Sequence, residues 1–385
     1  MAISTLDLLQ NKIDLSDVLS WRVSQSPTFI NLFATGEPAT QTEHKWLEGF
    51  ETPKTKAFTA YAYASSKGTF TVASSTGWHA GDRFHILGDS AVLEIESVTA
   101  TTIVVSGIKA ANGSALDLAT YTAASGGTLI FDSRPIPEGS TAGEDVWKQT
   151  GSESNYTQIF RTDVALTGTA MAVGQYGNEN KVEKQLEYAT DTIMRRMNAA
   201  LLFGAKIARS GSENGSLGGL YYWGTQQGGL SCAQVSSPAL KMNMIDTAAQ
   251  NISDAGGTPD IILCGSGQAR VISTFMSSQV RTSREDETVG RYITTFVTNA
   301  GGNVMRVFVE PSLPDTDVWV CDSRGFKLVP LTGRALHSEP GTTPGMDGQK
   351  VFVIGEYTAE FKNAKQSLCR ISGLQPSATT LAAGA

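Results

Sequence analysis

The chain contains 385 residues and carries 30 Lys and Arg against 37 Asp and Glu, a formal net charge of −7. Hydrophobic residues make up 41% and charged residues 17%, which is typical of a globular protein that can bury a large core without disulfides or metals. No apolar run approaches the roughly 18 residues that predict a membrane span, and residues 1–11 lack the pattern of a secretory signal. The acidic balance argues against a protein that grips nucleic acid, because phosphate binding requires a surplus of basic residues.

The first half of the chain predicts short elements around an inserted all-β domain. Residues 1–35 carry apolar positions at helical spacing but too few to form a core, so we expect an arm that lies on another surface. Residues 36–57 are polar and indicate an extended strand or loop. Residues 58–133 hold short apolar runs separated by glycine turns, which is typical of a small barrel or sandwich. Strands are expected there at 69–73, 83–87, 92–98, 102–106 and 128–131.

The strongest local pattern lies at 178–204, where apolar residues recur every three or four positions. It predicts one long helix with Asn178 or Asn180 as its N-cap and Gly204 as its end. Like charges four residues apart repel, so an acidic row on this helix is either a solvated face or a face that meets basic groups of a neighbouring chain. The row consists of Glu179, Glu183, Glu187 and Asp191.

Residues 134–172 predict a polar loop followed by a β-like run, and residues 235–335 alternate predicted helices and strands, as in an α/β or α+β domain. Helices are expected at 239–253 and 269–279. Strands are expected at 259–264, 292–298, 304–310, 317–321, 326–330 and 348–360, the last continuing to residue 371.

Motifs that carry chemistry are absent from the sequence. The segment GSGQAR follows a predicted strand, but Arg270 replaces the third glycine of a dinucleotide-binding turn, so a strand-to-helix turn capped by Ser266 is favoured. The cysteines form no C-x-x-C pair and the histidines stand singly in polar segments, so we expect reduced, mostly buried thiols and surface or loop imidazoles. The cysteines are Cys232, Cys264, Cys321 and Cys369, and the histidines are His44, His79, His85 and His337. We therefore expect no catalytic residues, no metal and no cofactor.

The order of these segments resembles the HK97-like fold of the major capsid proteins of tailed phages, in the subgroup whose E-loop carries an inserted β-barrel. The resemblance covers essentially the whole chain and implies an α+β fold with a small all-β insertion domain. It rests on TEHKWLEGFETP before the insertion, TGWHAGDRFHI and LEIESVTATTIVVS within it, RPIPEGSTAGED after it, the run from NYTQIFRTDVALTGTA through the long helix, and GSLGGLYYWG beyond.

The resemblance also implies a division of the chain into segments with separate tasks. These are an N-terminal arm at 1–35, an extended E-loop region at 36–172 with the barrel at 58–133, a peripheral domain with its spine helix at 173–215, an axial domain at 216–345, returning peripheral strands at 346–375 and a C-terminal tail at 376–385.

By the same resemblance, we expect a structural subunit that self-assembles into pentamers and hexamers of an icosahedral head and encloses double-stranded DNA without sequence-specific binding. An acidic subunit suits this task because it does not hold packaged DNA to the wall. Scaffolding, portal and decoration proteins are the implied partners, with assembly in the host cytoplasm, a final place in the virion and no membrane partner. Contacts between subunits are expected at Trp46, Lys54, Lys56, Glu179, Glu183, Glu187 and Asp191, with Lys54 or Lys56 of one chain pairing with the acidic row of the next.

Some relatives with this fold join an E-loop lysine covalently to an asparagine of a neighbouring subunit. Lys54, Lys56 and Asn363 lie in comparable regions of this chain. No residue-level motif matches, however, and ordinary surface residues are the favoured interpretation.

Three other functions remain as alternatives. An encapsulin-like compartment shell has the same fold and holds cargo protein, so particle size and nucleic-acid content distinguish it from a phage head. A glycan-binding surface module would be a monomer or small oligomer whose β-domain retains glycans. An enzyme would need a convergent catalytic set, and Cys264, Ser266 and His337 form none that can be recognised.

Overall fold

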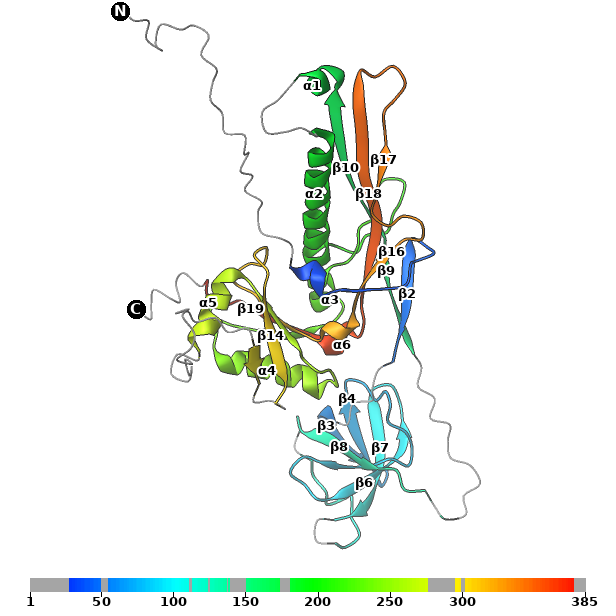
Figure 1. Ribbon diagram of the computed structural model, residues 1–385. Helices are drawn as coiled ribbons and strands as arrows, with labels where there is room; N and C mark the ends of the chain where they lie inside the picture. The colour runs from blue at the N-terminus through cyan, green and yellow to red at the C-terminus, as the bar shows by residue number, and fades with distance from the viewer. Residues whose placement is uncertain are drawn as a thin grey trace, which may run out of the picture. The chain divides into compact units, whose positions relative to one another are not determined.

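A computed structural model of the chain describes residues 28–49, 55–110, 113–123, 125–136, 138, 150–173, 181–275, 295–298 and 302–376. The chain forms two compact units (Figure 1). One, the main unit, contains the residues up to Glu48 and from Ser152 onwards, and the other, the inserted unit, contains Gly49–Gly151. The inserted unit therefore interrupts the sequence of the main unit.

The inserted unit is a closed barrel of antiparallel strands, which confirms the predicted small all-β insertion. Alternate side chains point inwards, so Phe70 meets Phe58 and Phe84 at ring-centroid distances of 5.0 and 5.7 Å in the barrel core. Around the barrel the strands follow the order β3 (Thr55–Ala64), β4 (Lys67–Val72), β7 (Thr102–Lys109), β6 (Val92–Val98), β5 (Arg83–Ile86) and β8 (Thr128–Ser133).

Strands β4 to β8 lie where the sequence predicted them, whereas β3 was not expected as a strand. The residues of β3 read TKAFTAYAYA, and small Ala and Thr side chains occupy most of its outward positions. The bulky residues Phe58, Tyr61 and Tyr63 are three and two positions apart, because a bulge between Phe58 and Ala60 interrupts the strict alternation of a strand. The barrel consequently begins at Thr55, before the expected boundary at residue 58.

The first sheet of the main unit has five strands, two of which are long. Strands β10 and β18 pair antiparallel from Gln158 opposite Tyr357 to Thr167 opposite Gly348. The order is β1 (Ala34–Thr35), β16 (Phe326–Pro330), β18 (Gly348–Phe361) and β10 (Gln158–Thr167), with β17 (His337–Pro340) also on β18 and helix α1 (Gly168–Ala172) after β10. A separate two-stranded ribbon joins β2 (Glu43–Glu48) to β9 (Gly151–Tyr156).

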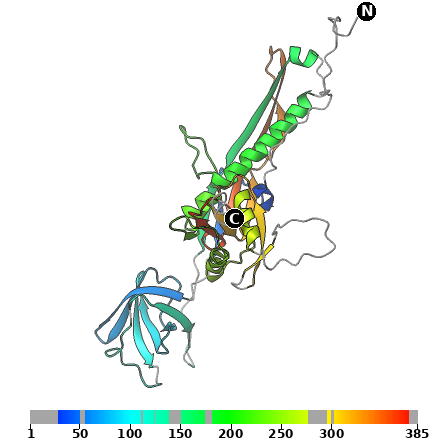
Figure 2. The same cartoon turned by 90° about the vertical axis from the view of Figure 1, so that its left-hand side faces the viewer.

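The long predicted helix is confirmed as α2 (Lys181–Phe203), which runs along β10 and β18 (Figure 2). A Cβ at Gly204 would lie 2.4 Å from the carbonyl oxygens of Ala200 and Leu217, so only glycine fits the close approach that ends the helix. The predicted N-caps Asn178 and Asn180 lie outside the described residues. The buried residues of α2 recur every fourth position from Ala189 through Leu201, with two adjacent positions added, and are Ala189, Ile193, Met197, Asn198, Leu201 and Leu202.

The second sheet has six strands and is covered on both faces. Ile262 and Cys264 of the central strand pack in one hydrophobic cluster with helices α4 and α5, while Ile261 and Leu263 pack in another with α2 and α3. The strand order is β11 (Leu230–Ala233), β19 (Leu368–Ser372), β15 (Val318–Cys321), β12 (Ile261–Cys264), β14 (Val304–Val309) and β13 (Thr295–Val297). The helices are α3 (Leu220–Thr225), α4 (Met242–Asp254), α5 (Ser266–Thr274) and α6 (Ala364–Ser367).

Two local expectations need correction. Helix α5 begins at Ser266, and its N-cap is Gly265, so the Ser266 hydroxyl does not cap the helix. It also begins three residues before the expected start at 269, because the turn itself adopts helical geometry.

No helix in the described part of the chain is both long and apolar enough to cross a membrane. Most of the expected N-terminal arm, residues 1–27, lies outside the description, which begins just before the short 3-10 helix η2 (Phe29–Leu32).

Candidate assembly surfaces

Trp46, one of the expected subunit contacts, belongs to the core of its own chain. It lies on β2 with 5% of its surface exposed, and its ring centroid lies 5.3 Å from that of Trp223. Its Nε1 donates a 2.8 Å hydrogen bond to Oε1 of Glu48. Strand alternation turns Leu47 outward, with 71% of its surface exposed. Trp46 is therefore not available for the expected contact, and Leu47 is the apolar side chain that β2 presents.

Lys56, the expected basic partner, is enclosed in the inserted unit. Its Nζ donates hydrogen bonds of 2.8 and 2.9 Å to the carbonyl oxygens of Ser74 and Thr76, and burial lowers its pKa. Its ammonium group is thus bound within its own chain, which differs from the sequence-based expectation of a loop lysine free to meet the acidic row of another chain. Asn363 caps α6 in the left-handed region at φ 53°, and its side-chain Oδ1 is buried. Neither residue is the ordinary surface side chain that was expected.

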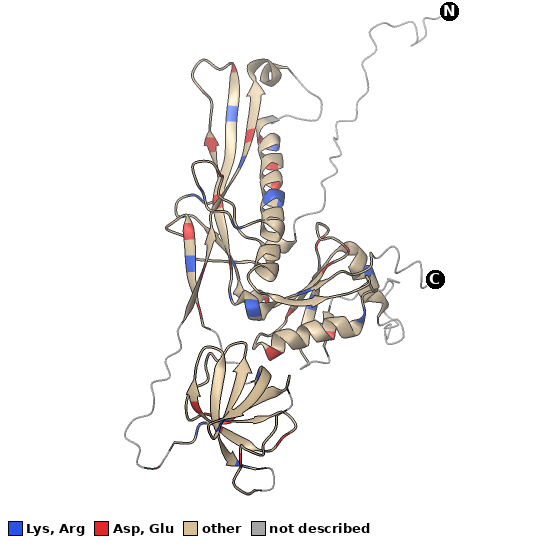
Figure 3. Cartoon of the chain, turned by 180° about the vertical axis from the view of Figure 1, so that it is seen from behind, with Lys and Arg blue, Asp and Glu red and all other residues tan. Residues whose placement is uncertain are grey.

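The acidic row is exposed along α2 where the structure describes it. Glu183, Glu187 and Asp191 are all exposed, in the N-terminal half of the helix. Figure 3 shows acidic and basic positions following one another along this helix. Glu179 and the second candidate lysine, Lys54, lie outside the described residues. The row thus remains a candidate contact face, without a partner lysine placed by the structure.

The start of the described chain is anchored by a buried carboxylate that the sequence analysis did not single out. Glu310 follows β14, and its Oε2 accepts hydrogen bonds from the Thr28 hydroxyl at 2.7 Å and the Phe29 amide at 3.0 Å. The side-chain Oδ1 of Asn198, on α2, accepts a 3.0 Å hydrogen bond from the Ile30 amide. Burial acts to raise the pKa of Glu310, but the hydrogen bonds it accepts outweigh burial and lower the pKa. The segment that leads back to residues 1–27 is therefore fixed at one point on the main unit.

A second buried carboxylate, Glu356 on β18, joins two surface loops. Its Oε1 lies 3.1 Å from Arg209, and its Oε2 lies 3.0 Å from Arg334. The Thr157 hydroxyl donates a 2.7 Å hydrogen bond to the same carboxylate. Breaking a buried pair by removing one partner is costly, because a charge is left without compensation. Glu356 therefore holds the loops that carry Arg209 and Arg334 in fixed positions on the sheet.

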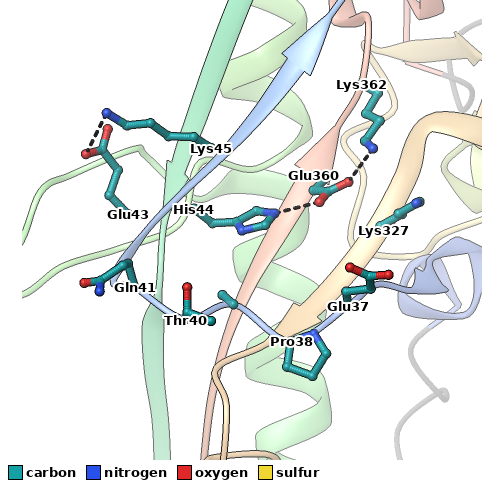
Figure 4. Close-up of a pocket in the computed structure, with 11 residues that line it drawn as sticks. Glu37, Pro38, Thr40, Gln41, Glu43, His44, Lys45, Lys327, Glu360 and Lys362 are labelled. Carbon is teal, nitrogen blue, oxygen red and sulfur yellow. Dashed lines mark hydrogen bonds and ion pairs between the residues drawn. The ribbon is translucent and has the colours of Figure 1, made fainter.

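A polar pocket of about 530 Å³ lies between β2 and the sheet (Figure 4). His44 and Lys362 both point at Glu360, with His44 Nε2 2.6 Å and Lys362 Nζ 3.2 Å from its carboxylate oxygens. Burial acts to raise the pKa of Glu360, but the bonds from His44 and Lys362 outweigh it and lower the pKa. Lys327 on β16 is the cross-strand neighbour of Glu360, and Glu37 also lines the pocket. Acidic and basic side chains therefore line the same pocket.

The side chains that line this pocket are mostly polar or charged. His44 is bound to Glu360. Among the residues that the structure describes, no group of three or more His, Cys, Asp or Glu side chains is placed to hold a metal ion.

Known structures share the whole architecture at low sequence identity. A chain of Microbacterium phage Oxtober96 matches with a TM-score of 0.53 and 9% identity, covering 97% of this chain and 99% of that chain. A capsid chain of a native GTA particle matches with a TM-score of 0.53 and 8% identity, covering 96% and 98%. A chain of Mycobacterium phage Adephagia matches with a TM-score of 0.50 and 12% identity, covering 97% and 98%. These likenesses bear out the predicted HK97-like fold.

The sequence itself matches one family model over nearly its full length. That model describes the SU10 major capsid protein, and it covers residues 2–375. A comparison with curated proteins gave no match. The match includes the inserted unit as well as the main unit, so the barrel lies within the span of the family model. The chain belongs to the SU10 major capsid protein family, and it is a structural subunit of the oligomeric, icosahedral capsid shell of a phage virion.

Proposed function

We propose that the chain assembles into pentamers and hexamers that together enclose double-stranded DNA, and that it has no catalytic role. The observation that carries the proposal is the family match over residues 2–375. The net charge of −7 supports it as well, because an acidic wall does not bind the packaged phosphate backbone. Scaffolding, portal and decoration proteins are the partners that such assembly in a host cytoplasm requires.

We further propose that the acidic row on α2 is one of the faces through which subunits meet. Glu183, Glu187 and Asp191 present a line of exposed carboxylates on a rigid helix held against β10 and β18. A basic segment of a neighbouring chain could form ion pairs with carboxylates spaced in this way. Lys54 is the proposed partner, since Lys56 is bound inside the barrel.

The inserted barrel is proposed to make contacts outside its own chain, with neighbouring subunits or a decoration protein. It has a hydrophobic core of its own, so its outer surface is not needed to stabilise the barrel. Leu87 lies on that surface with 66% exposed and Tyr63 with 42% exposed. Exposed apolar side chains of this size are common at protein contacts when they gather in one patch.

Sedimentation velocity of the purified protein, followed by nuclease treatment and extraction of particles made in host cells, tests the proposed function. We expect particles far larger than a single chain, with double-stranded DNA that survives nuclease when the particles are filled. A protein that stays monomeric at every concentration, alone and beside the other head proteins of its virus, would contradict the proposal. Particles that contain only protein cargo would favour the compartment shell.

A further inference from the structure

Two of the four cysteines meet across neighbouring strands, although 137 residues separate them in the sequence. Cys232 lies on β11 and Cys369 on β19, and the two strands run parallel. The register pairs Leu230 with Cys369, so Cys232 stands two positions further along β11 and projects from the same face of the sheet. The two Sγ atoms lie 3.5 Å apart. A disulfide requires the sulfur atoms to approach to about 2.05 Å. Because residues two positions out of register on adjacent strands lie roughly 7–8 Å apart, closing the bond would also draw β11 towards β19.

The two thiols differ in access. Cys232 is half-buried on the edge strand of the six-stranded sheet, whereas Cys369 is 0% exposed on the next strand inwards. An oxidant in solution can therefore reach Cys232 first. Cys369 needs no access of its own, because its target is a sulfur atom of the same chain.

The surroundings of Cys232 also favour its thiolate. Its Sγ shares a hydrogen bond with the Cys369 thiol, and Asn251 on α4 donates a second hydrogen bond to it from Nδ2 at 3.1 Å. These bonds outweigh burial and lower the pKa of Cys232, while the bond to Cys232 and burial raise the pKa of Cys369. The thiolate is the form of cysteine that attacks disulfides, so Cys232 is the reactive member of the pair.

We propose that Cys232 and Cys369 form an intrachain disulfide when the protein meets a small-molecule disulfide oxidant such as oxidised glutathione, and that Cys232 reacts first. The Cys232 thiolate attacks one sulfur of the oxidant, which forms a mixed disulfide and releases one glutathione thiolate. Cys369 then loses its proton to solvent and attacks Sγ of Cys232, which releases the second glutathione as a thiolate. Two protein thiols are oxidised and one glutathione disulfide is reduced to two thiols, so the electrons balance.

The bond would fasten an edge strand to the interior of the sheet. Among the strands that the structure describes, β11 pairs with β19 alone, and helices α3 and α4 also contact it. A disulfide at this position closes a long loop of chain, which raises stability mainly by restricting the unfolded state. The pair would stay reduced in a reducing compartment and close in an oxidising one.

Thiol counting on the full-length protein tests the proposal. The reduced protein is incubated with oxidised glutathione at neutral pH, unfolded under acid quench, and titrated with a thiol reagent, and its peptides are analysed by mass spectrometry. We expect two of the four thiols to disappear, a Cys232–Cys369 linked peptide, and Cys264 and Cys321 still reduced as internal controls. Four remaining thiols, a disulfide between two chains, or a lasting mixed disulfide on Cys232 would each overturn it.

Single substitutions separate the two roles. C369S should keep glutathione bound to Cys232, because no second thiol releases it. C232S should retain its three thiols and react far more slowly, because Cys369 is buried. Rapid glutathione attachment at Cys369 in C232S would contradict the assigned order of reaction. The count on the unsubstituted protein stands even if either variant fails to fold.

Discussion

The Thr28 hydroxyl donates a 2.7 Å hydrogen bond to the Glu310 carboxylate, across 282 positions of the sequence. This bond, with the Phe29 amide on the same oxygen, fixes the point at which the N-terminal segment meets the main unit. A carboxylate is needed there because every nearby partner is a donor. The anchor is thus an electrostatic feature of the fold, and its contribution can be measured.

Glu310→Gln should lower the free energy of unfolding by about 1–3 kcal/mol, because the amide offers one weaker acceptor and places N–H groups against buried donors. Thermal unfolding of the full-length protein measures the change. Glu339→Gln is the matched control, since Glu339 pairs with His337 at an exposed site and exposed pairs contribute about 0–1 kcal/mol. Equal effects of the two substitutions would contradict the role given to Glu310.

The same anchor should depend on pH. The pKa of Glu310 in the folded protein lies below its ordinary value of 4.5, so the ionised carboxylate stabilises the fold at neutral pH. This stabilisation is complete above pH 4.5 and is lost as the pH falls through the lowered folded-state pKa. The difference in unfolding free energy between the unsubstituted protein and Glu310→Gln should therefore shrink in acid. A difference that stays constant from pH 7 to acid, or grows there, would show that the charge of Glu310 is not involved.

Lys56→Met should destabilise the barrel by about 1–3 kcal/mol, because the carbonyl oxygens of Ser74 and Thr76 lose the donor that satisfies them. Lys67→Met is the control, since Lys67 forms an exposed ion pair with Glu96 and should change stability by less than about 1 kcal/mol. Calorimetry of the full-length protein reports both. If Lys56→Met left barrel stability unchanged but weakened assembled shells, Lys56 would be a subunit contact after all.

Shells with Glu183→Gln, Glu187→Gln and Asp191→Asn should dissociate more easily at low salt and should lose most of their sensitivity to salt. An exposed ion pair contributes about 0.2–1 kcal/mol and is weakened by salt. Because a shell repeats the contact many times, these small contributions add up. Light scattering during a denaturant titration at two salt concentrations measures this. Asp254→Asn, an exposed acid on α4, makes the same charge change away from the row. Unchanged shell stability and unchanged salt sensitivity would remove the row from the interface.

The ribbon of β2 and β9 predicts how the inserted unit can be deleted. Because β2 and β9 pair, residues 50–149 can be replaced by a two-residue Asn-Gly turn. This removes the whole barrel and leaves β2 and β9 intact. The main unit should then unfold at an unchanged temperature, since the barrel has a core of its own. Particle formation and binding of decoration proteins are then compared with the full chain. Normal particles with normal decoration would eliminate the proposed contact role of the barrel.

Features that depend on local pattern could be predicted from the sequence. The periodicity of α2 and the turn spacing of β4 to β8 are encoded within short windows, and both were placed within a few residues. The order of these elements along the chain was enough to show the resemblance to the HK97-like fold. The local pattern did not predict β3, because a bulge between Phe58 and Ala60 interrupts the alternation of its bulky residues.

Features that depend on distant pairing could not be predicted. Trp46 stands in a polar segment, and only its contact with Trp223 shows that it belongs to the core. Lys56 looks like a loop lysine until the barrel closes around it. Glu310 and Thr28 carry no motif at all, because their relation arises from the folded chain. Candidate contact residues taken from sequence order alone were therefore less accurate than the fold.

Cryo-electron microscopy of assembled particles can show both the shell and its subunit contacts. We expect closed icosahedral shells of pentamers and hexamers, with the α2 side chains Glu183, Glu187 and Asp191 against a basic segment of a neighbouring subunit. Particles of another symmetry, or shells in which this face of α2 borders only solvent, would contradict it.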